Sequence, residues 1–396
     1  MLANSQARRR RGELAREPPG TVSFRAIALP SQAQVPEKKK YSCSANGILA
    51  AMLLALCPVF VAAQSGTEPM AALDLQFDAK HAGEITRLRK LIADLARAEP
   101  AQVGAKRGNK AARAETRKAL EDARNALADL AVDYVAQIEM AEALVRIDYG
   151  QVLADRYKKD FSDTLWRLNQ RSNAGEVRAA ATLGALYRLG IVAGRDEKKA
   201  CDYYRRAAQK GQVAALFHAS ACDDPKSEAA IRMRDLAAAG GHPVAQEMRG
   251  RECLREKSNA ACALAWLERA AAQGRASAMS LLGWMYSTGD LVLRDDTRAF
   301  GYFMNAARLG DAAAQNNVGQ LYETGRGVPA DGGEAFAWYK RAAEAGLGSA
   351  QVNLARSYIE GRGTAPDRTA AKFWLEQAQK QRIAEAAKLL EWMEAH

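Results

Sequence analysis

Residues 316–346 read NNVGQLYETGRGVPADGGEAFAWYKRAAEAG and decide the fold of this chain. Apolar residues recur at helical spacing up to Tyr322 and resume at Ala335, while Gly325 to Pro329 cannot continue a helix. Gly346 then ends the second helical stretch. The segment is therefore predicted to form a helix, a turn and a second helix.

The same pattern recurs along the chain with a period of 36 residues. Closing glycines stand at 274, 310 and 346, and each is followed twelve residues later by a tyrosine, at 286, 322 and 358. A small residue precedes each tyrosine by three positions: Gly283, Gly319 and Ala355. Gly175, Gly184 and Tyr187 fit this frame upstream, with two shorter units ending near residues 241 and 274. Because one helix pair cannot bury its apolar stripe alone, we expect six units that stack on one another.

The motif Asn317-x-Gly319-x-x-Tyr322-x-x-Gly325-x-Gly327-Val328, followed by Asp331 and by WYKRAA at 338–343, resembles the Sel-1-like repeat. This resemblance covers about residues 175–381 and implies an all-α, right-handed α/α superhelix of tetratricopeptide-like helix pairs, of the exported bacterial type. Residues 173–396 are expected to hold the six repeats and a C-terminal capping helix. The two short units lack the glycine-rich loop.

Residues 64–172 precede the repeats and are expected to be helical. One apolar stripe runs from Ile85 to Leu95 and a longer one from Leu120 to Leu144, with Pro100 and Gly104 as breaks between them. Two or three heptads fit a helical hairpin packed on the first repeat, or a short coiled coil that dimerises.

The N-terminal region is predicted to direct export. Residues 38–63 combine three lysines, an apolar run and a small-residue cleavage site near Ala63, which indicates a signal peptide and a periplasmic location. Cys57 leaves open a lipoprotein. Residues 1–37 are interpreted as a disordered leader or an over-extended start. Nine Lys or Arg against three Asp or Glu lie in the first 40 residues, more than half of the net charge of +11. No membrane span is expected after cleavage.

Four cysteines remain after the predicted cleavage. Cys201 and Cys222 lie ten residues before and eleven after the turn glycine Gly211, so they come level in a helix hairpin. Cys253 and Cys262 flank a short connection. We expect the disulfides Cys201–Cys222 and Cys253–Cys262 in an oxidising compartment, against the alternative of four buried thiols.

Motifs that carry chemistry are missing from the sequence. The four histidines, at 81, 218, 242 and 396, have no metal-ligand spacing, and nucleophile or phosphate-loop motifs are absent. The sequence predicts no catalytic residue, no metal and no cofactor, and so not an enzyme.

A scaffold or adaptor of the cell envelope is the predicted function, with another protein or an extended peptide bound on the concave face. By helix register and by the resemblance, the expected contact residues are Trp284, Ser287, Asn316, Asn317, Gln320, Glu323, Asn353, Arg356 and Ile359. Asn317 and Asn353 are expected to grip a ligand backbone, or instead to satisfy helix ends between units.

The alternative is a module for envelope glycan, either exopolysaccharide or peptidoglycan. It would use Trp284, Trp338 and Trp374 together with a basic cluster at the turn before the repeats: Lys106, Arg107, Lys110, Arg113, Arg117 and Lys118. Nucleic acid is not expected as a partner of an exported protein.

Overall fold

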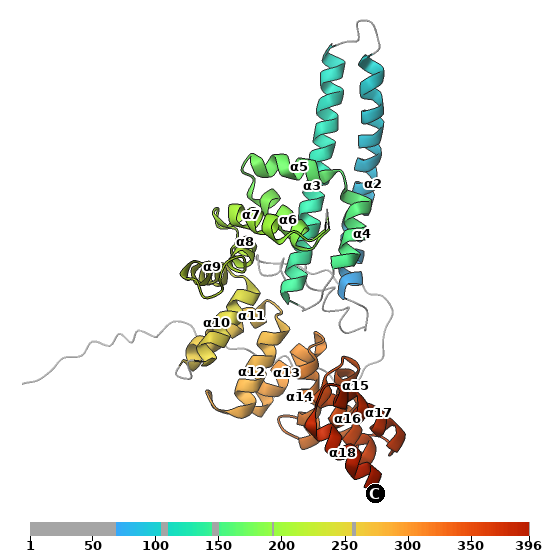
Figure 1. Ribbon diagram of the computed structural model, residues 1–396, viewed down its shortest axis with the longest axis vertical. Helices are drawn as coiled ribbons and strands as arrows, with labels where there is room; N and C mark the ends of the chain where they lie inside the picture. Colours follow the sequence, from blue (N-terminus) through green and yellow to red (C-terminus); the bar gives the residue numbers. More distant parts are fainter. Residues whose placement is uncertain (1–68, 104–109, 145–149, 192–193, 256–258, 396) are drawn as a thin grey trace, which may run out of the picture. The chain divides into compact units, whose positions relative to one another are not determined.

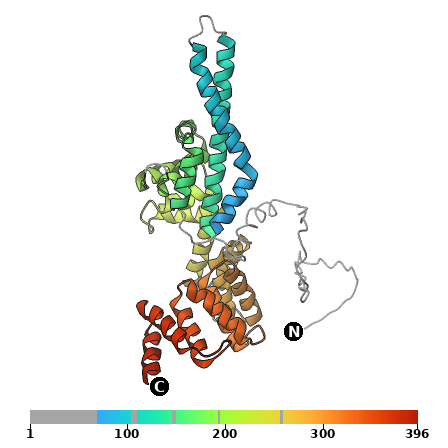
Figure 2. The same cartoon turned by 90° about the vertical axis from the view of Figure 1, so that its right-hand side faces the viewer.

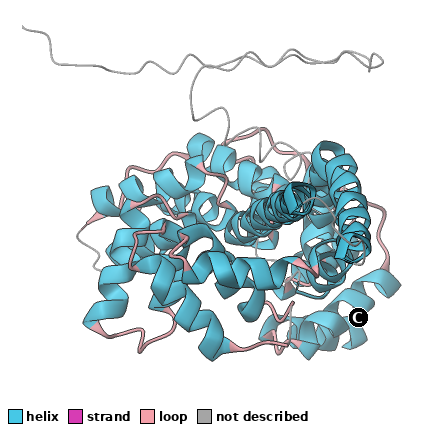
Figure 3. Ribbon diagram, turned by 90° about the horizontal axis from the view of Figure 1, so that it is seen from above, coloured by secondary structure: helices cyan, strands magenta, loops and turns pink. Residues whose placement is uncertain are grey.

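The computed structural model describes residues 69–103, 110–144, 150–191, 194–255 and 259–395. Within these ranges every regular element is an α-helix, and consecutive helices pack in antiparallel pairs (Figures 1 and 3). The chain therefore folds as an α/α solenoid, as the sequence predicts. The predicted leader (1–37), the signal peptide (38–63) and Cys57 lie outside the described residues.

Two long helices, α2 (Pro69–Val103) and α3 (Lys110–Leu144), lie side by side ahead of the solenoid (Figure 2). Their shared core includes Phe77 and Tyr134, whose ring centroids are 4.9 Å apart. The sequence predicts a break at Pro100, but α2 continues to Val103. A proline three residues from a helix end removes only one backbone N–H from the hydrogen-bond ladder. Dimerisation through this region stays a prediction.

Two short helices, α4 (Gly150–Phe161) and α5 (Thr164–Asn173), lead into the solenoid. Six helix pairs follow, and a single helix, α18 (Ala384–Ala395), ends the chain. The pairs are α6 (Val177–Arg188) with α7 (Glu197–Ala208), α8 (Val213–Ser220) with α9 (Glu228–Ala239), α10 (Pro243–Arg255) with α11 (Ala260–Ala272), α12 (Ala276–Thr288) with α13 (Asp296–Arg308), α14 (Ala312–Thr324) with α15 (Gly332–Glu344), and α16 (Gly348–Glu360) with α17 (Arg368–Lys380).

The glycine and aspartate signature of the repeat works through the helix ends. Gly325 ends α14 with a φ of 69°, in the left-handed region that glycine adopts without strain. Asp331 then caps α15, where its carboxylate accepts a hydrogen bond from the backbone N–H of Glu334 at 3.0 Å. Gly361 and Asp367 repeat both roles around α16 and α17.

Small residues allow the two helices of a pair to approach closely. A Cβ added at Gly319 would lie 2.6 Å from the ring of Tyr339, and one at Gly283 would lie 2.8 Å from the ring of Phe303. Neither distance is tolerated by real atoms, so the fold requires glycine at these positions. The residue that follows each of these glycines lies on another side of its helix and does not face the partner helix.

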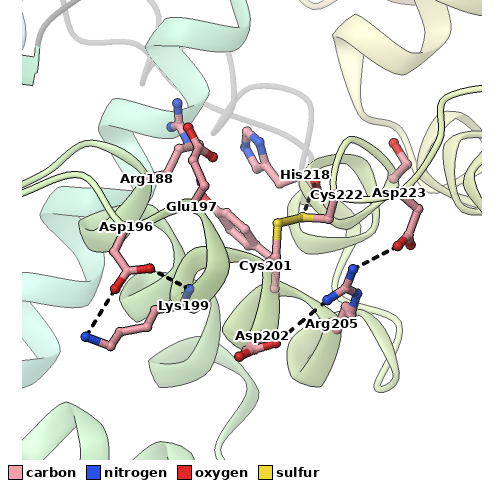
Figure 4. The surroundings of a disulfide bond; sticks show 12 residues. Arg188, Asp196, Glu197, Lys199, Cys201, Asp202, Arg205, His218, Cys222 and Asp223 are labelled. Carbon is pink, nitrogen blue, oxygen red and sulfur yellow. Dashed lines mark hydrogen bonds and ion pairs between the residues drawn. A yellow bond between two sulfur atoms is a disulfide. The ribbon is translucent and has the colours of Figure 1, made fainter.

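The structure joins both predicted cysteine pairs. Cys201 of α7 is bonded to Cys222, just after α8 (Figure 4), and Cys253 of α10 to Cys262 of α11. In later repeats an aromatic contact spans the junction that the first disulfide closes. Phe300 and Tyr322, 22 residues apart, have ring centroids at 5.3 Å. Cys201–Cys222, with a separation of 21 residues, therefore replaces the aromatic contact between one repeat and the next.

Helix α3 packs on the first helices of the solenoid. Its carboxylates meet a row of arginines from α5 and α6, in the pairs Asp129–Arg171, Asp133–Arg178 and Glu142–Arg188, each at 2.6 Å. The guanidinium of Arg275, at the start of α12, donates to the carbonyl of Ala143 at 2.7 Å. The hairpin and the first repeats also share one hydrophobic core.

Helix α18 is the segment for which the sequence predicts a capping role, and it packs against α17. Glu391 takes the position at which α12 and α14 carry the glycines that admit a neighbouring helix, and it is exposed. A charged residue there is costly to bury under another helix. The capping role of α18 stays a prediction.

Candidate functional site

A cavity of about 420 Å³ opens on the first helices of three successive pairs, α12, α14 and α16. Its volume lies in the range of ligand pockets. The residues that line it are Trp284, Ser287, Phe303, Asn317, Gln320, Leu321, Glu323, Thr324, Arg326, Asn353 and Arg356.

The repeat register explains why these residues gather. Trp284, Gln320 and Arg356 are each the tenth residue after a closing glycine, and Ser287 and Glu323 are each the thirteenth. Equivalent positions of stacked repeats lie in a row, so one side of the solenoid presents them together. We call the seventh, tenth and thirteenth residues after the closing glycine the inner positions.

Trp284 is the large apolar group at this site. Its side chain is 44% exposed, whereas most large apolar residues of the repeats are buried. An exposed tryptophan beside polar groups is typical of a surface that another molecule covers. It provides an apolar platform at the α12 end of the cavity.

The one carboxylate of the cavity is already engaged within the protein. One oxygen of Glu323 accepts from the hydroxyl of Tyr339 at 2.6 Å, and the other pairs with Arg362. Burial raises the pKa of Tyr339, and the bond to Glu323 raises it further. The negative charge of Glu323 is therefore balanced by Arg362, although each oxygen keeps a lone pair.

Hydrogen-bond donors are more available. Arg356 uses one nitrogen for the carboxylate of Glu385 on α18, and this ion pair is exposed. Within the described residues, no side chain bonds the amides of Asn317 or Gln320 or the indole N–H of Trp284. A ligand that accepts hydrogen bonds would therefore find free partners along the cavity.

Seven of the nine contact residues predicted from the sequence line this cavity, and Asn316 and Ile359 do not. Asn316 is only 6% exposed and accepts a hydrogen bond from the amide of Asn353 at 2.9 Å. The equivalent residue of the next repeat is Val352, which is buried. Ile359 occupies an inner position, but it packs into the core that α17 and α18 share.

Sequence reasoning missed Phe303, Leu321, Thr324 and Arg326. The guanidinium of Arg326 reaches back one repeat, to the carbonyl of Ser287 at 3.0 Å and to Asp296 at 2.7 Å. Hydrogen bonds from Arg294 and Arg326 lower the pKa of Asp296 to about 2. The signal was the Gly-Arg-Gly loop, which recurs at 361–363 with Arg362 reaching back to Glu323.

The tryptophans of the glycan alternative do not form one surface. Trp338 is only 7% exposed, and its indole N–H donates to Glu334 at 3.1 Å. Trp374 is partly buried against the cores of the last two repeats. Only Trp284 of the three lines the cavity. In the basic cluster, Lys106 and Arg107 lie outside the described residues, and the other four lie at the start of α3.

A second polar cluster is buried where α3 meets the first repeats. The hydroxyl of Tyr204 donates to Glu139 at 2.9 Å, and Nε2 of His218 lies 3.5 Å from the same carboxylate. Burial raises the pKa of Glu139 to about 7, although Arg188 acts in the opposite direction. Burial also holds the pKa of His218 well below its ordinary value. His218 and Arg188 lie beside the Cys201–Cys222 disulfide (Figure 4).

The part of the chain that the structure describes offers neither a metal site nor a membrane span. There, no group of three or more His, Cys, Asp or Glu side chains could hold a metal ion. None of the described helices is both long and apolar enough to cross a membrane.

The family model described as Sel1 repeat matches residues 177–212, 249–274, 276–311, 312–347 and 348–381. Helices α8 and α9, the pair with the shortest first helix, fall between the first two matches. Among curated proteins, the comparison finds no match.

Solved structures, in contrast, include proteins that are similar to this chain. A Sel1 repeat protein from Oxalobacter formigenes is 26% identical, covers 59% of this chain and 97% of its own, and has a TM-score of 0.50. A protective antigen present in uropathogenic Escherichia coli strains, described as displaying an SLR fold, is 19% identical. It covers 88% of this chain and 91% of its own, with a TM-score of 0.43.

Proposed function

Because the chain carries five Sel1 repeats, we propose that it is a non-enzymatic scaffold or adaptor that binds a partner protein in the cavity on α12, α14 and α16. Sel1 repeat proteins are generally protein-interaction scaffolds. Stacked repeats of this kind use extended concave surfaces for binding. The partner segment is an extended peptide, which the row of inner positions can follow from one repeat to the next.

One observation carries this proposal: the chain itself already uses the inner positions to hold a helix. In the first repeat the thirteenth residue after the closing glycine is Arg188, which binds Glu142 of α3 at 2.6 Å. The same positions in later repeats, Ser287 and Glu323, line the open cavity. This contact supports the proposal that a partner segment contacts the same positions in the later repeats.

The proposed location is the cell envelope, and the two disulfides support it. Disulfides persist in exported proteins and are rare in the reducing cytosol. The glycan alternative lacks support, because its three tryptophans do not share a surface. We therefore put forward a single function.

The test is photo-crosslinking in the native cell. A photoreactive residue replaces Trp284 or Gln320, and the adducts are identified by mass spectrometry. Trp392 on α18 is the matched control, since it is also a tryptophan, is also 44% exposed and lies outside the cavity. The proposal expects one dominant protein adduct from the cavity positions that the control does not give. Adducts that are equal at all three positions, or none from the cavity, would contradict it.

A further inference from the structure

The hydrogen-bonding state of the cavity restricts the chemistry of its ligand. Its donors are the guanidinium of Arg356, the amides of Asn317 and Gln320, and the indole N–H of Trp284, and Arg356 alone has five N–H groups. Both oxygens of Glu323 are engaged, by Tyr339 and by Arg362, and the positive charge of Arg362 balances its negative charge. Arg326 is likewise held by Ser287 and Asp296. What remains available is rich in donors and carries a positive charge.

Asn317 is left free by a difference between neighbouring repeats. In the next repeat the equivalent residue, Asn353, donates to Asn316 at 2.9 Å and so closes the junction between α14 and α16. The corresponding partner of Asn317 on α12 is Ser280, whose buried hydroxyl has no hydrogen-bond partner among the described residues. The junction between α12 and α14 is therefore not closed in the same way, and the amide of Asn317 faces the cavity.

The bond that Arg356 makes does not block a ligand. Its ion pair with Glu385 leaves the two side chains 40% and 50% exposed. Exposed pairs of this kind contribute little to stability. A guanidinium that is bonded through one nitrogen can still hold a second carboxylate through the others.

The segment that the chain binds internally has the same chemistry. Helix α3 presents Asp129, Asp133 and Glu142 to arginines of α5 and α6. Its apolar stripe packs on the first repeats between these contacts. The occupied half of the solenoid thus recognises carboxylates beside apolar side chains.

We infer that the open cavity selects an acidic segment of the partner protein, with a carboxylate on Arg356, backbone carbonyls on Asn317 and Gln320, and an apolar side chain on Trp284. This inference rests on the proposed function and adds the chemical class of the partner segment. The order of the contacts runs from apolar at α12 to acidic at α16.

A charge swap isolates the preference for a carboxylate. The double variant R356E/E385R keeps the exposed ion pair with its signs reversed, so the fold is retained while the cavity presents a negative group. The control is the double variant R178D/D133R, which reverses another exposed ion pair, between α6 and α3 and outside the cavity. Thermal unfolding of all three proteins verifies that they are folded.

The probe is a displayed library of random nonapeptides, selected against the purified full chain. The inference expects the wild type and the control to enrich peptides with Asp or Glu beside an apolar residue, and R356E/E385R to enrich Lys or Arg. A peptide selected on the wild type should bind R356E/E385R about tenfold more weakly or worse. W284A should reduce its binding as well.

Two results would overturn the inference in distinguishable ways. If all three proteins enrich the same peptides and W284A abolishes the enrichment, the cavity binds peptides without preferring acids, and only this inference fails. If the wild type enriches no peptide, or W284A changes nothing, the cavity does not bind peptides. The proposed function then fails together with the inference.

Discussion

The two halves of the solenoid use the same repeat positions differently. In the first half, Ala185 is the tenth residue after a closing glycine and is completely buried, in a core that α3 shares. In the second half the equivalent residue is Trp284, which is 44% exposed. A surface that the chain covers itself can be small and apolar, while a surface left open carries an aromatic platform and polar groups. This difference is what the proposed binding of a partner segment to the second half rests on.

The junction of the two halves should be the most sensitive point for stability. Arg275 and Glu247 are 4% and 5% exposed, are paired at 2.5 Å, and link α10 and α12 to the end of α3. Arg275→Ala leaves Glu247 buried without this partner and should lower the free energy of unfolding by about 3 to 5 kcal/mol. Urea unfolding measures the loss. Arg356→Ala, in the exposed pair of the open half, should cost less than about 1 kcal/mol. Equal losses would contradict the distinction.

The Cys201–Cys222 disulfide, in the first half of the solenoid, should make the next largest contribution to stability. C201S/C222S removes the bond between α7 and α8 and should destabilise the protein by about 2 to 4 kcal/mol. In F300A/Y322A the junction of the second half loses its aromatic contact instead. Denaturant unfolding under oxidising and reducing conditions measures the loss of stability in both double variants. If reduction destabilises the wild type but not C201S/C222S further, this bond carries the redox effect; if both respond equally, Cys253–Cys262 carries it.

The buried carboxyl group of Glu139, in the first half of the solenoid, predicts that the free energy of unfolding depends on pH. The pKa of Glu139 is about 7 in the folded state, above its ordinary value of 4.5. Its contribution is therefore complete below pH 4.5 and is lost as the pH rises through 7, by up to about 3 kcal/mol. His218 and His242, whose pKa values burial lowers, have the opposite slope and lose stability as the pH falls below 6.5.

Glu139→Gln separates these two effects. The variant keeps the histidines and the contact to Tyr204 but cannot titrate at this position. The difference in unfolding free energy between wild type and variant, measured from pH 4.5 to 8, should fall with rising pH. A difference that is constant over this range would show that Glu139 does not titrate there.

In the second half of the solenoid, which carries the cavity, we expect a small effect on stability and a large effect on partner binding. Trp284→Ala should lower the unfolding free energy by about 1 to 2 kcal/mol, because the side chain is 44% exposed and only its covered part contributes. Partner binding should weaken about 30-fold or more if Trp284 anchors the interface. Titration of a captured partner gives the affinity, and Trp392→Ala is the control. An equal loss in both variants would argue against the cavity.

Much of this arrangement follows from the sequence because the fold is periodic. The glycines, the tyrosines and the capping aspartates predict the helix pairs, and the register places Trp284 and Gln320 on one side. Register also explains why Asn316 does not line the cavity, since the equivalent residue of the next repeat, Val352, is buried. The sequence of one repeat does not show that this position is buried; the equivalent residue of the next repeat does.

What the sequence could not predict depends on contacts between distant parts of the chain. Arg275 binds a carbonyl 132 residues away, and the carboxylates of α3 meet arginines more than 40 residues on. The sequence predicts a helical hairpin packed on the first repeat, but no local pattern indicates which residues pair across that contact. Ile359 also lies outside the cavity because of such contacts, since it is partly buried against the core that α17 and α18 share.

Hydrogen exchange of the full chain, with and without the partner captured at Trp284, tests the central claim most directly. The account predicts slower exchange on binding in α12, α14 and α16, with α6 and α8 unchanged because α3 already covers them. Protection confined to α2 and α3, or to the second helices of the pairs, would contradict it.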